Sequence, residues 1–104
     1  MSPDLRPVTL CVLLWAAPGE ADLLTSYESE VLALVPRHGG RVVSRVRSLD
    51  AGTSTDDPTE MQVIEMPDEA ALAAYMADPE RTARLDVRDR AVARTQILRV
   101  SPVD

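Results

Sequence analysis

Hydrophobic residues follow strand-like and helix-like patterns in turn along the chain. Residues 8–16 are apolar almost throughout and stop before Pro18-Gly19, which predicts a central strand buried on both faces. Residues 41–49 and 60–66 alternate between two faces, as strands do, and residues 95–101 form a fourth predicted strand. The pattern therefore predicts a sheet of four strands.

Two segments between these strands have helical spacing. The first carries an apolar stripe, ends at Pro36 and is released into the next strand by Gly39-Gly40. The second opens at Pro67, is rich in alanine over residues 70–77, is interrupted by Asp78-Pro79 and resumes over residues 80–92. The stripe of the first helix consists of Leu24, Tyr27, Val31 and Leu34.

The predicted order of elements is β-α-β-β-α-β. This order is the ferredoxin-like split βαβ pattern, an α+β fold in which helices cover one face of a four-stranded antiparallel sheet. We expect one domain over residues 1–104, with an N-terminal tail at residues 1–7 and a flexible hairpin loop at residues 50–59 that can act as a lid.

The opposite face of the sheet is too apolar to face water. A monomer seldom exposes such an area, so we expect a homodimer that pairs sheet to sheet. The residues predicted on this open face are Cys11, Leu13, Trp15, Val43, Val63 and Ile97.

Composition and charge exclude several classes of protein. The 104 residues carry 17 Asp and Glu against 11 Lys and Arg, a net charge of −6, so the chain lacks the basic footprint of a nucleic-acid-binding protein. No run approaches the roughly 18 apolar residues of a membrane span. With a single cysteine, Cys11, and a single histidine, we expect no metal site and a cytoplasmic location. A secretory signal peptide is the alternative, because Ala16-Ala17-Pro18 resembles a cleavage site.

His38 is the first candidate for acid–base chemistry. It is the only side chain here whose unperturbed pKa lies near neutrality. The alternative is a structural role, because a cation after the first helix also suits the helix dipole.

Arg45 is the candidate for binding negative charge. Strict alternation places it on one cationic face with Arg41 and Arg47, where it needs a carboxylate, and Glu65 on the neighbouring strand can supply one. The pair is either a structural bridge or a site in which Arg45 binds an anionic oxygen while Glu65 orients the ligand or takes a proton.

Four further side chains are candidates for ligand binding. Trp15, Tyr27 and Tyr75 can stack on a ligand or donate hydrogen bonds to it, although most such aromatic residues are core. Arg88 is a candidate as well, although a solvated network of ion pairs with neighbouring acids also accounts for it, and better than ligand binding does.

Three stretches together resemble the small dimeric α/β-barrel superfamily, and within it an uncharacterised family of about this length. They are residues 38–45 (HGGRVVSR), residues 64–71 (IEMPDEAA), and Asp78-Pro79-Glu80 followed by residues 85–89 (LDVRD). The chain departs from that family at Arg81, where the family typically has tyrosine, and at Val46, where it often has glycine. Arg88 matches a recurrent family arginine.

The resemblance implies a homodimer whose two sheets form one barrel, with a pocket between sheet and helices in each protomer. Relatives include muconolactone-isomerase-like and antibiotic-biosynthesis-monooxygenase-like proteins.

Fold alone does not choose a function, so hypotheses of different kinds stay open. The first is an enzyme without a bound cofactor, a monooxygenase or isomerase of an aromatic or polyketide-like compound, with His38 as acid or base and Arg45 stabilising negative charge. The second is a homodimer that binds a small organic molecule, or serves as an accessory protein, without catalysis. The third is haem binding or degradation with His38 as the axial ligand.

Overall fold

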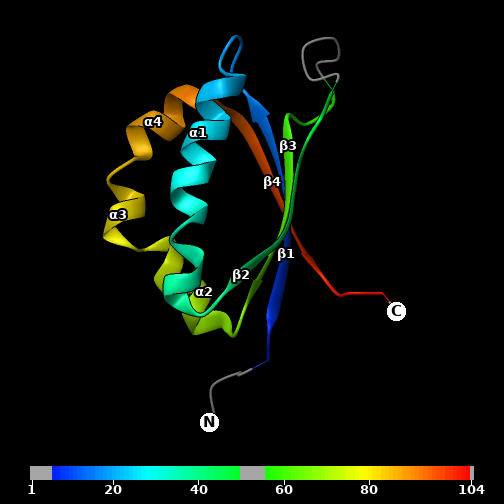
Figure 1. Cartoon of the computed structure of the whole chain (residues 1–104), viewed down its shortest axis with the longest axis vertical. Coiled ribbons are helices and arrows are strands. Elements are labelled where there is room, and N and C mark those ends of the chain that lie inside the picture. Colours follow the sequence, from blue (N-terminus) through cyan, green and yellow to red (C-terminus); the bar gives the residue numbers. More distant parts are fainter. Residues whose placement is uncertain (1–5, 50–55, 104) are drawn as a thin grey trace.

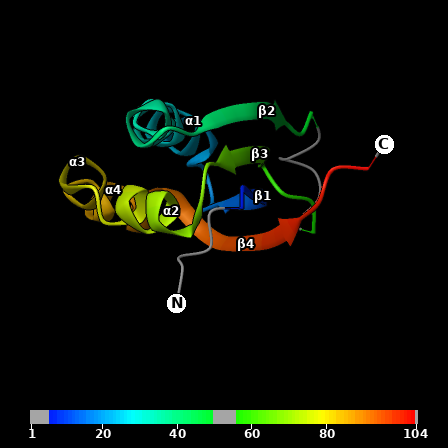
Figure 2. The ribbon, with the colours of Figure 1, turned by 90° about the horizontal axis from the view of Figure 1, so that it is seen from below.

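A layer of helices covers one face of a four-stranded antiparallel sheet in the computed structural model, which describes residues 6–49 and 56–103 (Figure 1). The strands are β1 (Val8–Ala16), β2 (Arg41–Arg47), β3 (Glu60–Met66) and β4 (Val92–Val100), in the spatial order β2-β3-β1-β4. Figure 2 shows this order and the helices on one side of the sheet only. The predicted ferredoxin-like α+β fold is confirmed.

The helical layer is built from α1 (Ala21–Leu32), the 3₁₀ helix η1 (Val35–His38), α2 (Glu69–Met76), α3 (Pro79–Thr82) and α4 (Leu85–Ala91). The α-helical part of the first helix ends earlier than predicted, and Pro36 lies within η1. Proline fits there because the first positions of a helix do not need its missing N–H group. Gly39 follows with a φ of 80°, a left-handed conformation that favours glycine.

The second predicted helix is divided into three short helices. Asp68 and Asp78 cap α2 and α3 by accepting hydrogen bonds from the backbone N–H groups of Ala71 and Glu80. The chain then leaves α4 directly into β4, which begins at Val92 rather than at residue 95.

The central strand β1 connects the two faces of the sheet. Its side chains alternate between buried and half-buried, and the buried set packs under the helices. Burying such an apolar side chain stabilises the fold by about 1.5–3 kcal/mol. The buried set in β1 consists of Val8, Leu10, Val12 and Leu14.

A bulge in β2 changes which arginines share a face. Val42 pairs with Ile64 and Ser44 with Val63, so Val43 is an extra residue that interrupts the alternation. As a consequence, Arg41 lies on the open face, whereas Arg45 lies on the face covered by helices. The prediction of one cationic face on this strand was therefore wrong.

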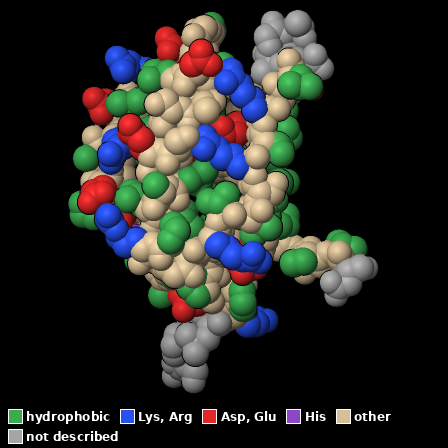
Figure 3. All heavy atoms as spheres, in the orientation of Figure 1, with side chains coloured by type: hydrophobic (Ala, Val, Ile, Leu, Met, Phe, Trp, Pro, Cys, Tyr) green, Lys and Arg blue, Asp and Glu red, His purple; other side chains and the backbone are tan. Residues whose placement is uncertain are grey.

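The register of β4 corrects one residue of the predicted open face. Leu98 pairs with Cys11, and Ile97 pairs with the buried Val12, so Leu98 and not Ile97 belongs to the open face. Hydrophobic side chains border the sheet side of the space-filling view in Figure 3. We use the name open face for the outward side chains of the sheet, which include Cys11, Leu13, Trp15, Ser44, Met61, Val63, Gln96, Leu98 and Val100.

The predicted hairpin loop and the predicted N-terminal tail are each described only in part. Residues 50–55 of the loop and 1–5 of the tail lie outside the described residues. The C-terminal end of the loop is held against β1, because the Thr59 N–H group donates to the Leu14 carbonyl at 2.7 Å and its hydroxyl accepts from the Ala16 N–H group at 3.0 Å. None of the helices in the described ranges is both long and apolar enough to cross a bilayer.

Candidate functional site

His38 is bound to an acid that the sequence analysis did not single out. Its Nε2 atom lies 2.8 Å from Oδ2 of Asp78, which is 4% exposed. Arg37 reaches the same oxygen at 3.4 Å. The hydrogen bond from His38 is the main cause that lowers the pKa of the Asp78 carboxyl. His38 therefore ties η1 to the cap of α3, and the haem hypothesis gains no support because Nε2 is already engaged.

The Tyr75 ring contacts both His38 and Arg81. It meets the His38 ring edge to face with centroids 6.1 Å apart, and the guanidinium carbon of Arg81 lies 5.3 Å from the Tyr75 centroid. The buried Tyr75 hydroxyl donates to the Val31 carbonyl at 3.2 Å. Burial raises the pKa of the Tyr75 phenol.

Tyr27 on α1 is 2% exposed, and its hydroxyl finds no hydrogen-bond partner among the described residues. Burial raises the pKa of the Tyr27 phenol, and the positive charges of Arg81 and Arg88 act in the opposite direction. The guanidinium groups of α3 and α4 are therefore close enough to Tyr27 to affect its ionisation.

Arg81 carries another buried polar atom that, like the Tyr27 hydroxyl, has no hydrogen-bond partner among the described residues. Its Nη1 donates to the Met76 carbonyl at 3.3 Å, whereas its Nε finds no hydrogen-bond partner within the described chain. Arg81 belongs to α3, on the outer side of the helical layer in Figure 1, and its side chain is half-buried. The neighbouring Arg88 donates from Nη2 to the Thr95 hydroxyl at 3.1 Å.

The sequence-based pairing of Arg45 with Glu65 is corrected by the structure. Arg45 donates from Nε and Nη2 to both carboxylate oxygens of Glu60, at 2.7 and 3.1 Å, and also to Ser29 and Thr25 of α1. Glu65 is instead paired with Arg41 at 3.2 Å on the open face. The bulge at Val43 is the physical reason, because it turns Arg45 towards the helices.

Beside Glu60 lies a buried polar chain. Gln62 donates from Nε2 to Glu60 Oε2 at 2.6 Å and to Glu28 Oε1 at 2.7 Å. All three side chains are at most 7% exposed. Burial raises the pKa of the Glu28 carboxyl, and the charge of Glu60 raises it further, while the hydrogen bond from Gln62 acts in the opposite direction.

The structure therefore brings only some of the predicted site residues together. Tyr27, Tyr75 and Arg88 contribute to one region under the helices, and His38 borders it through the Tyr75 ring. We call this region the interior cluster: Tyr27, Glu28, Gln62, Tyr75, Arg81 and Arg88. Trp15 lies on the open face, where Arg94 covers its ring at 4.3 Å and its Nε1 donates to the Asp56 carbonyl at 3.2 Å.

Three members of the interior cluster were missed in the sequence analysis. Glu28 follows Leu24 by four positions and precedes Val31 by three, so helical spacing places it on the buried stripe. Gln62 shares its face of β3 with Ile64 and Met66 in the same way. A polar residue on each of two facing apolar stripes is the signal that could have identified them. Nothing in the apolar patterns identified Arg81.

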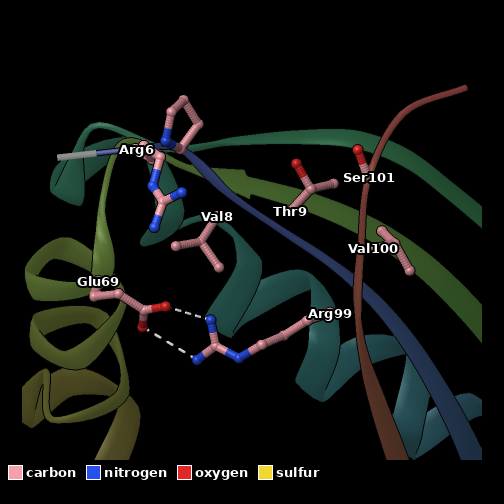
Figure 4. A pocket seen from close by; sticks show the side chains of 8 residues that line it. Arg6, Val8, Thr9, Glu69, Arg99, Val100 and Ser101 are labelled. Carbon is pink, nitrogen blue, oxygen red and sulfur yellow. Dashed lines mark hydrogen bonds and ion pairs between the residues drawn. The ribbon is translucent and has the colours of Figure 1, made fainter. Parts of the chain in front are cut away.

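A separate surface groove lies where β1 begins and β4 ends. It has a volume of about 310 Å³ and is lined by Arg6, Pro7, Val8, Thr9, Glu69, Arg99, Val100 and Ser101. Figure 4 shows Arg99 and Glu69 facing each other across it through two contacts, of which Nη2 to Oε2 measures 3.1 Å. Glu69 therefore neutralises the charge that Arg99 would offer to an anionic ligand.

No group of three His, Cys, Asp or Glu side chains arranged to hold a metal ion occurs among residues 6–49 and 56–103. The interior cluster offers instead a phenol, a guanidinium and a carboxyl group. These groups can donate hydrogen bonds to an oxygen atom and exchange a proton with a bound molecule.

Fold and residue pattern together define a ferredoxin-like α+β protein with a polar cluster between sheet and helices. The chain belongs to the family described as a domain of unknown function, DUF1330, which it matches over residues 18–101. This confirms the expected superfamily. No curated protein matches the chain.

Solved structures share the fold at low sequence identity. A protein of unknown function from Rhodopseudomonas palustris is 21% identical with a TM-score of 0.77, over 97% of this chain and 85% of that one. A candidate antibiotic biosynthesis monooxygenase from Bacteroides thetaiotaomicron is 15% identical with a TM-score of 0.74, over 95% and 91%. A dabb family protein with a ferredoxin-like fold from Mesorhizobium loti is 19% identical with a TM-score of 0.61, over 94% and 98%.

Proposed function

We propose that this protein is a homodimer that binds a small organic molecule in each protomer, between the sheet and the helices, at the interior cluster. The observation that carries the proposal is a pair of buried polar atoms, Tyr27 Oη and Arg81 Nε, that have no hydrogen-bond partner among the residues the structure describes. A buried donor left unsatisfied costs about 1–3 kcal/mol, so a native protein retains two of them near each other for a reason. An acceptor oxygen of a ligand satisfies both.

The chemistry of these groups defines the ligand. A phenol and a guanidinium both donate hydrogen bonds, so they favour a carbonyl, phenolate or carboxylate oxygen. The rings of Tyr27 and Tyr75 favour an aromatic or polyketide-like body for the same molecule. Arg81 is half-buried in the outermost helix, and we expect the ligand to enter past its side chain.

The open face supports the homodimer. Within the described chain, Val46 is 51% exposed, Leu98 44% and Val100 39%, on a sheet face that carries no helix. A second copy of the chain presents the same apolar area, which is the self-complementarity that a two-fold dimer needs. Charged residues lie beside the apolar area, including the Arg41–Glu65 pair and Arg94, and these suit the polar rim of an interface.

Catalysis of proton transfer without a cofactor, as in an isomerase or monooxygenase, is the form of this function that we prefer. The likeness to a candidate antibiotic biosynthesis monooxygenase agrees with it at the level of the fold. Non-catalytic ligand binding is the second form, because Arg45 and His38 are both engaged by buried acids in structural contacts.

A ligand screen with matched variants tests the proposal. Thermal stability is measured with aromatic carboxylates, quinones, polyketide-like phenols, aromatic 2-oxo acids and haem, since a ligand that binds the native state raises its stability. We expect a hit to bind tenfold or more weakly to Tyr27→Phe and Arg81→Met. Tyr75→Phe, whose hydroxyl already has a partner, and the exposed Arg90→Met are the controls. The proposal is overturned if no ligand binds, or if a ligand binds Tyr27→Phe and Arg81→Met as tightly as it binds the wild type.

A further inference from the structure

Glu28 is a buried acid that forms no ion pair with any of the described residues. Its side chain is 7% exposed on the sheet-facing side of α1. Burying an ionised carboxylate without a counter-ion is costly, so burial raises the pKa of such a group and makes it a stronger base when it is ionised.

The neighbouring acid differs from Glu28 in one decisive contact. Glu60 is held by two hydrogen bonds from Arg45, which neutralises its charge. The Gln62 amide donates a hydrogen bond to both acids. Glu28 therefore has a neutral hydrogen-bond donor, whereas Glu60 has the same neutral donor and also the Arg45 guanidinium. Two carboxyl groups with such different surroundings are suited to different roles, one held in an ion pair with Arg45 and one able to exchange a proton.

The charged and polar groups that act on Glu28 come from several elements. Tyr27 lies on its own helix, Arg45 comes from β2, Glu60 and Gln62 from β3, Tyr75 from α2 and Arg81 from α3. Of these, Arg45 and Arg81 act to lower its pKa, but burial and Glu60 outweigh them and the pKa stands above the ordinary glutamate value.

We infer that Glu28 is the acid–base residue of the interior cluster, and that the bound molecule is a carbonyl compound with an acidic C–H bond next to its carbonyl group. The inference rests on the proposed function, because it needs a ligand beside Tyr27 and Arg81. Those two donors bind the carbonyl oxygen, and Glu28 faces the carbon that loses the proton.

The chemical step balances without a further reactant. The Glu28 carboxylate takes the proton from carbon, and the electron pair of the broken C–H bond becomes the double bond of an enolate. Arg81 and Tyr27 stabilise the negative charge on the enolate oxygen. Return of the proton from the Glu28 carboxyl to oxygen or to another carbon gives the enol or an isomer. An acid whose pKa is raised towards neutrality suits both halves of this exchange.

The first test measures the ionisation of Glu28 in the free protein. Carbon-13 NMR follows the side-chain carboxyl resonances against pH, and Glu28→Gln identifies the signal by its loss. We expect this signal to titrate clearly above the ordinary glutamate value of about 4.3. Glu30→Gln, an exposed acid on the same helix, removes a different signal and is the control. A Glu28 signal at the ordinary value overturns the inference.

The second test uses phenylpyruvate, an aromatic 2-oxo acid with an enolisable C–H bond. Proton NMR in D₂O follows the replacement of its benzylic protons by deuterium. We expect the wild type and Glu30→Gln to accelerate this exchange, and Glu28→Gln to bind phenylpyruvate but lose at least about a hundredfold of the acceleration.

The outcomes separate the inference from the proposed function. If Glu28→Gln exchanges deuterium as the wild type does, Glu28 is not the base, while ligand binding stands. If phenylpyruvate and other panel ligands bind but the wild type accelerates no exchange of carbonyl compounds, the inference falls and the non-catalytic form of the function remains. If no ligand binds, both fall.

Discussion

Arg45 and Glu60 face each other across neighbouring strands and form a two-point ion pair under the helices, with Nε to Oε2 at 2.7 Å and Nη2 to Oε1 at 3.1 Å. Glu60 is 2% exposed, so this pair is buried at its acidic end. A buried carboxylate that loses its partner is far more costly than a surface one. The pair therefore has a structural role. Glu65, which was predicted from the sequence as the partner of Arg45, lies on the opposite face of the sheet.

Replacing Arg45 tests this assignment. We expect Arg45→Met to lower the free energy of unfolding by about 3–5 kcal/mol, because Glu60 remains buried without a cation. Glu65→Gln removes only an exposed pair and should cost no more than about 1 kcal/mol. Urea denaturation measures both, and the double variant Arg45→Met/Glu60→Leu should recover part of the loss. Equal losses for Arg45→Met and Glu65→Gln would contradict the observed pairing.

The two buried tyrosines should respond differently to loss of the hydroxyl. Tyr75→Phe removes the hydrogen bond from the hydroxyl to the Val31 carbonyl, so we expect it to cost about 1 kcal/mol. Tyr27→Phe removes a hydroxyl that has no partner in residues 6–49 and 56–103, and we expect the free protein to keep its stability or gain up to about 1 kcal/mol. Chemical denaturation of both variants without ligand makes the comparison. A loss in Tyr27→Phe as large as that in Tyr75→Phe would reveal a partner for the Tyr27 hydroxyl.

Adjacent residues of β4 allow a matched test of the dimer. Leu98 is 44% exposed on the open face, and Ile97 is 51% exposed but faces the other way. We expect Leu98→Arg to be a folded monomer, because a charge at the centre of an apolar interface opposes association, whereas Ile97→Arg should remain a dimer. Light scattering gives the mass, expected as twice 11.3 kDa for the wild type. A monomeric wild type, or dissociation by both variants, would remove the argument for the open face.

Asp78 should contribute a pH-dependent part of the stability. Its folded pKa is lowered, chiefly by the hydrogen bond from His38, so its contribution is present above the unfolded pKa of about 3.9. That contribution declines as the pH falls below about 4 and is lost once the pH is below the folded pKa. We expect Asp78→Asn to be less stable than the wild type at pH 7 and to approach it near pH 3. Urea denaturation from pH 3 to 7 makes the comparison, with the exposed Asp86→Asn as the control variant.

The site shows where sequence patterns stop being sufficient. Tyr27 was predicted as a ligand-binding residue because it lies on the apolar stripe of α1, and the structure places it in the interior cluster. Whether it binds a ligand stays a prediction. Glu28 lies beside it on the same stripe, yet its importance appears only when Gln62 of β3 is brought against it from 34 positions along the chain.

The sequence by itself determined the order of elements and the position of the central strand. Those features depend on short-range sequence signals. They are the apolar run over residues 8–16, the helical stripe through Leu24 and Val31, and the caps and prolines that bound each segment. Only the tertiary structure decided the partners of the charged residues. One extra residue at Val43 shifts the register of β2, and as a result Arg45 pairs with Glu60 instead of the predicted Glu65. An ion pair forms between side chains that the register brings together, and local periodicity does not record a bulge.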